Sequence, residues 1–148
     1  ERYALWDGSG GAGKYRGGCG QWQEVELLTE APVTISVRAD RTRNPARGTA
    51  GAGPGSCTRV LLNDEEINPK GITIGHKGDR LRVMTPGSGG YGDPLERDPK
   101  RIAEDVNNGL VSPESARALY GVVVDVATGK VNSAATVKRR QARTAKAA

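Results

Sequence analysis

The chain has 148 residues, a formal net charge of +5 and a hydrophobic content of 36%, with 21 glycines and no Phe. This length fits one domain, but the apolar content is low for an independent core, so we expect a partner chain to complete it. The 2 cysteines and 1 histidine exclude a zinc site made by this chain alone, and no run of about 20 apolar residues is present to cross a membrane.

Glycine clusters occupy residues 8–13, 17–20 and 87–92. Runs of glycine mark positive φ angles or the close approach of another backbone or ligand, so function is sought there first. The first cluster is not a phosphate-binding P-loop, because Tyr15 follows Lys14 where Ser or Thr would bind magnesium. It also precedes a strand-like region, whereas a dinucleotide fingerprint follows a strand and opens a helix.

Alternation of polar and apolar residues predicts half-buried strands at residues 24–27 and 33–37. The turn-rich connector at 29–32 favours their pairing as an antiparallel hairpin. Further segments alternate in the same way and predict a β-meander, at residues 59–62, 72–74 and 81–84. His76, just before the last of these, is expected to be an exposed turn residue.

The loop at residues 39–56 lacks any periodicity. A loop of this length in a compact domain is usually functional or bound to a partner. Arg41, Arg43 and Arg47 are therefore candidate anion ligands, because a guanidinium offers a bidentate fork to carboxylate or phosphate. The alternative is a solvated basic loop that Asp40 partly neutralises.

The apolar period changes from two to 3.6 after the third glycine cluster. Asp98 followed by Pro99 predicts the start of a helix, and Gly109 predicts its end. Ser112 with Pro113 predicts a second helix, and the two should pack as a helical hairpin.

The last part of the chain predicts a Val-rich strand at 121–126 and a terminal helix capped by Asn132. The basic run at 138–146 is interpreted as a solvated helix end or a tail lying on an acidic partner. It contains no aromatic residue for base stacking, so no nucleic-acid partner is predicted. The whole chain, residues 1–148, is predicted to be one α+β domain, antiparallel and β-rich over about 1–86 and helical over about 98–146.

Motifs spread in order over nearly the whole chain carry a family resemblance, at residues 9–20, 85–94, 97–99, 106–112 and 120–123. With them the chain resembles the carboxyl-terminal portion of the hydantoinase B/oxoprolinase family, here as a separate chain. The resemblance implies a small subunit that completes a B-type subunit, with large hydantoinase A-like and B-like subunits as partners, in the cytoplasm and away from membranes.

The same resemblance implies a biotin-independent, ATP-dependent carboxylase that acts on an aromatic ketone. The alternative within the family is an ATP-dependent hydantoinase or oxoprolinase that hydrolyses cyclic amides, and the alternative of another class is a basic binding module. ATP and a divalent metal are expected on the other subunits, and none in this chain, for which no catalytic, cofactor-binding or metal-binding residue is predicted.

The candidate structural or interface residues are the motif glycines with their polar and aromatic neighbours: Trp6, Gly10, Gly11, Tyr15, Arg16, Gly17, Gly18, Trp22, Gly89, Gly90, Tyr91 and Asp93. Buried aromatic anchors dominate interface energetics, which favours Trp6 and Trp22 as contacts to a large chain. Packing within this domain is the alternative for both tryptophans.

Overall fold

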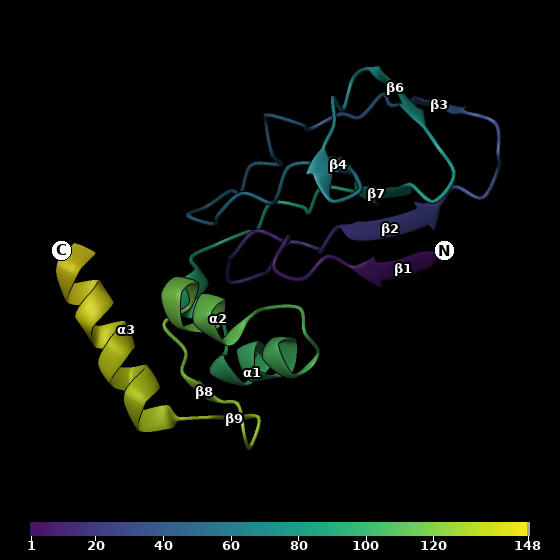
Figure 1. Cartoon of the computed structure of the whole chain (residues 1–148). Helices are drawn as coiled ribbons and strands as arrows, with labels where there is room; N and C mark the ends of the chain where they lie inside the picture. The colour runs from purple at the N-terminus through teal and green to yellow at the C-terminus, as the bar shows by residue number, and fades with distance from the viewer. Residues whose placement is uncertain (148) are drawn as a thin grey trace.

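The computed structural model describes the backbone of residues 1–147 and the side chains of residues 1–143. The strands gather at one end of the molecule and the helices at the other, with irregular glycine-rich segments between them (Figure 1). The predicted α+β class is confirmed. The interpretation of the chain as one domain stays a prediction.

The main sheet has five strands in the order β1-β2-β7-β4-β5, and every neighbouring pair is antiparallel. Its strands are β1 (Arg2–Leu5), β2 (Gln21–Glu26), β7 (Arg80–Met84), β4 (Arg59–Leu62) and β5 (Glu65–Glu66). Residue alternation places Val60 on a buried face, at 2% exposure. The sequence did not predict β1, whose four residues are all exposed.

The predicted hairpin between residues 24–27 and 33–37 is wrong. β3 (Val33–Ser36) pairs with β6 (Ile72–Gly75) in a separate small sheet, while β2 lies between β1 and β7. The predicted meander is wrong for the same reason, because β6 leaves the main sheet and β7 returns between β2 and β4. Alternation defines the buried face of a strand but does not choose between a near and a distant partner.

The predicted helix starts are confirmed. In α1 (Pro99–Asn107), the Asp98 side chain accepts a hydrogen bond from the Lys100 N–H at 2.9 Å. In α2 (Pro113–Leu119), Ser112 Oγ accepts from the Ser115 N–H at 3.1 Å. Each cap satisfies a donor that the first helical turn leaves free, and proline fits the first position because its missing N–H costs nothing there.

The Val-rich segment forms only a short strand, β8 (Val124–Asp125), which turns into β9 (Lys130–Val131). α3 (Ser133–Ala147) follows, and Asn132 Oδ1 accepts from the Ala135 N–H at 3.0 Å, as the predicted cap requires. Thr136 Oγ1 accepts from the Val123 N–H at 3.1 Å and is buried. α3 is therefore docked at its first turn.

The basic run of α3 is not simply solvated, which corrects the sequence interpretation. Arg140 Nε donates to the Tyr120 carbonyl at 3.1 Å, and Arg143 donates to the Ala118 carbonyl at 2.7 Å. These carbonyls lie at the end of α2, where a helix leaves acceptors unsatisfied and favours positive charge. The side chains of 144–146, in the same predicted run, lie outside the described residues.

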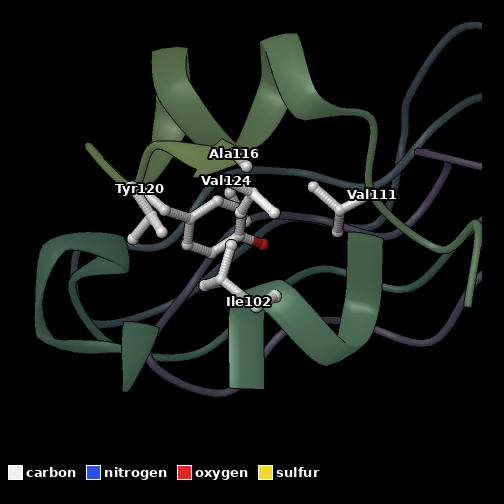
Figure 2. Packing of buried hydrophobic residues seen from close by; sticks show 8 residues of the cluster. Ile102, Val111, Ala116, Tyr120 and Val124 are labelled. Atoms are coloured by element: carbon white, nitrogen blue, oxygen red, sulfur yellow. The ribbon is translucent and has the colours of Figure 1, made fainter. Parts of the chain in front are cut away.

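The hydrophobic core lies among the helices. Ile102 of α1 and Tyr120 at the end of α2 are 0% and 1% exposed and face one another (Figure 2). Val111, Ala116 and Val124 surround them. Ala12, from the first glycine cluster, joins the same core, so the helices and the glycine-rich segments share one packed interior.

Candidate functional site

Three glycine-rich segments lie against one another, and we call residues 8–20, 48–55 and 87–92 together the glycine bundle. The Gly11 N–H donates to the Ser88 carbonyl at 2.8 Å, and the Gly53 N–H donates to the Ala12 carbonyl at 2.7 Å. The Gly90 N–H then donates to the Gly53 carbonyl at 3.1 Å, so every segment is bonded to the other two. The long arginine loop thus supplies the third segment, which the sequence clusters alone did not indicate.

The segments touch through backbone atoms. A Cβ at Gly17 would lie 2.1 Å from the carbonyl oxygen of Ser88, which no side chain tolerates. Equally close backbone contacts occur at other predicted glycines, namely Gly10, Gly11, Gly89 and Gly90. Gly18 differs, because its nearest neighbour would be the Ser88 Oγ at 3.7 Å. The glycines are therefore packing requirements of this chain.

The bundle presents two tyrosines to solvent. Tyr15 and Tyr91 exchange backbone hydrogen bonds of 2.9 Å in each direction, and their rings lie 6.2 Å apart with a 42° tilt. The two side chains are 60% and 57% exposed. An exposed tilted aromatic pair on a rigid backbone is typical of a contact surface, because large rigid side chains lose little entropy on binding.

A charge cluster joins the bundle to α1. The Asp105 carboxylate accepts from Arg97 at 2.8 Å and lies 3.4 Å from Arg16 Nε. The side chains of Asp105 and Arg97 are 11% exposed and that of Arg16 is 14% exposed, so one carboxylate neutralises two nearly buried guanidinium groups. Arg97 also donates to the Lys14 carbonyl at 3.1 Å.

Asp105 and Arg97 were missed as site residues. Asp105 stands three residues after the buried Ile102 of α1, on the apolar face, and a carboxylate at that position is the signal that a buried cation faces it. Burial raises the pKa of the neighbouring Tyr120 hydroxyl, while the positive charges of Arg97 and Arg16 oppose that shift. Tyr120 is therefore a neutral core residue and not a proton-transfer group.

The other predicted interface residues have partners within the chain. The Arg82 guanidinium lies 5.7 Å from the ring centroid of the half-buried Trp22, a cation–π contact. Trp6 is half-buried, and its N–H donates to the Gly20 carbonyl at 2.8 Å. Asp93 caps the short 3₁₀ helix η1 (Pro94–Glu96).

The structure brings Arg41 and Arg43 to one groove, which Arg47 does not line. His76 is exposed at its turn, as predicted. Cys19 and Cys57 are free thiols. Among the described residues, no three His, Cys, Asp or Glu side chains form a group that could hold a metal ion, and no helix is long and apolar enough to span a membrane.

The chain matches known proteins over most of its length. The family model described as hydantoinase B/oxoprolinase matches residues 1–94. Caprolactamase subunit beta of Pseudomonas jessenii is 38% identical over 150 residues, which is 95% of this chain and 26% of that subunit. The chain thus spans about a quarter of the length of the curated relatives it matches.

Solved structures show the same fold. The crystal structure of the ATP-dependent caprolactamase from Pseudomonas jessenii superposes with a TM-score of 0.76 and 34% identity, over 95% of this chain and 26% of that chain. The nucleotide-free structure of acetone carboxylase, from work on ATP-dependent acetone carboxylation, gives a TM-score of 0.73 and 25% identity, over 97% of this chain and 24% of that chain.

Proposed function

The chain belongs to the hydantoinase B/oxoprolinase family, and on this premise we propose that it completes the B-type subunit of an ATP-dependent enzyme. The observation that carries the proposal is the match to caprolactamase subunit beta, which covers 95% of this chain but only 26% of that subunit. Most of such a subunit lies outside this chain. The chain alone is therefore not catalytic in this account.

The partners in this proposal are large A-like and B-like subunits in the cytoplasm. Apolar side chains left exposed support a partner surface, because burying them is favourable. They include the tyrosine pair Tyr15 and Tyr91 and, on the small sheet, Ile72 and Ile74, which are 71% and 49% exposed.

ATP and a divalent metal are assigned to the other subunits, and biotin is not required. The glycine bundle does not fit a nucleotide phosphate, because the N–H groups of Gly11, Gly53 and Gly90 already donate to backbone carbonyls. We derive no step of the reaction through this chain's glycines.

The first candidate reaction is carboxylation of an aromatic ketone, acetophenone to benzoylacetate, with this chain in the role of the acetophenone carboxylase small subunit. The fold match to acetone carboxylase supports it. The second candidate is ATP-dependent hydrolysis of a cyclic amide, which the higher identity to the caprolactamase supports. The comparisons fit the two reactions about equally.

Bicarbonate dependence separates the two reactions. The purified complex would be supplied with ATP and either acetophenone or a cyclic amide (caprolactam, hydantoin or oxoproline), each with and without bicarbonate. Ketone loss that requires bicarbonate supports the carboxylase, and amide hydrolysis without bicarbonate supports the hydrolase. ATP consumption that none of these compounds stimulates would contradict both.

A further inference from the structure

A basic groove lies beside the long loop, away from the glycine bundle. Arg41 and Arg43 line it together with Lys70, which the sequence places 27 residues after Arg43. Its volume is about 770 Å³, within the range of small-molecule sites. The remaining lining residues are polar or compact: Thr42, Asn44, Glu66, Asn68 and Pro69.

The backbone of the groove is held in place by a buried threonine. Arg41 has a φ of +52°, a conformation that non-glycine residues adopt only under constraint. Its carbonyl accepts from the Thr58 N–H at 3.0 Å, and the Thr58 hydroxyl donates to the Asp40 carbonyl at 2.6 Å. Thr58 is 8% exposed. The arginines therefore extend from a fixed turn, although their side chains are in solvent.

Positive charge is in excess in the groove. Within the described part of the chain, the guanidinium groups of Arg41 and Arg43 have no hydrogen bond or ion pair. The one carboxylate in the lining, Glu66, is already bound by Arg59 at 2.5 Å. Lys70 lies 3.4 Å from Asp40, whose side chain is 95% exposed and contributes little.

We propose that this groove binds a small molecule that carries a phosphate or carboxylate group. Two guanidinium groups without partners offer charge-assisted, bidentate hydrogen bonds to the oxyanion, and Lys70 adds a third positive charge. The proposal does not depend on which reaction the enzyme performs. Arg47, on the far side of the loop, has no part in it.

The test measures anion binding by calorimetry on the full chain, in the assembly in which it purifies, with inorganic phosphate and with citrate as separate probes at low salt. The variant R41Q/R43Q removes both guanidinium groups. R101Q/R117Q is the matched control, because it removes the same charge from exposed helical arginines outside the groove. Circular dichroism verifies that both variants fold.

Saturable binding of either probe is expected, weakened about tenfold or more in R41Q/R43Q and unchanged in the control. The stronger probe identifies phosphate or carboxylate as the preferred group, and added salt weakens binding because the groups are exposed. No saturable binding, or equal loss in both variants, would overturn the proposal. Binding to the isolated chain that disappears when the large chains are present would also overturn it, since an acidic partner surface would then occupy the groove.

Discussion

Gly89 lies directly against the backbone of Arg47, so close that a Cβ at position 89 would stand 2.1 Å from the Arg47 carbonyl oxygen. The contact joins the third glycine cluster to the arginine loop, two segments that are 42 residues apart in the sequence. It shows that the glycine-rich motifs by which the family is recognised are first of all the contacts through which this chain packs on itself.

Replacing Gly89 by Val should destabilise the chain by about 2–3 kcal/mol or more, because a side chain there collides with fixed backbone. The free energy of unfolding from urea titration measures the effect. Gly18→Ala is the matched control and should change stability little, since its new methyl group would meet nothing closer than 3.7 Å. Equal stability of the two variants would show that the bundle adjusts freely.

Replacing Asp105 by Ala should cost about 3–5 kcal/mol of stability, because it leaves Arg97 and Arg16 nearly buried without their shared carboxylate. Glu96→Ala is the control. It breaks the 3.0 Å pair with Lys14, whose side chains are 59% and 46% exposed, and should cost less than about 1 kcal/mol. Similar losses for both in chemical denaturation would argue against the charge cluster as the joint between the bundle and α1.

Truncation after Arg139 should lower stability by about 1–3 kcal/mol, because it removes Arg140 and Arg143 from the carbonyls at the end of α2. Truncation after Arg143 keeps these bonds and serves as the control. Thermal unfolding of the two proteins compares them directly. If the shorter protein melts at the same temperature as the longer one, the arginines of α3 do not dock it.

Stability should fall in acid partly through Glu24. Hydrogen bonds from Arg82 hold the pKa of its carboxyl below the ordinary value of 4.5. A depressed pKa contributes stability above the ordinary value, and this is lost as pH falls through the lower folded-state pKa. Glu24→Gln should therefore show a smaller drop in melting temperature between about pH 5 and pH 3 than the parent chain. Glu26→Gln, on the same strand, is the control, and an identical slope for parent and Glu24→Gln would contradict the assignment.

Local signals in the sequence predicted the helices well. Asp98, Ser112 and Asn132 each cap the helix that follows, because capping is decided within three residues of the cap. Strand existence was also predictable at β4, β6 and β7, where alternation reflects one buried face.

Pairing was not predictable, because partners such as Glu24 and Arg82 are 58 residues apart and no local signal joins them. The candidate site divides in the same way. The sequence predicted close backbone approach at the glycines but not that the approach is to one another. The Arg16 and Asp105 pair spans 89 residues and required the fold to be found.

Co-expression of the chain with A-like and B-like large subunits, followed by mass measurement of the purified assembly, tests most directly whether the chain completes a B-type subunit. The account predicts one stoichiometric complex that contains this chain and hydrolyses ATP. A chain that stays a stable monomer in the presence of both large subunits, or one retained on nucleic acid at moderate salt, would contradict it.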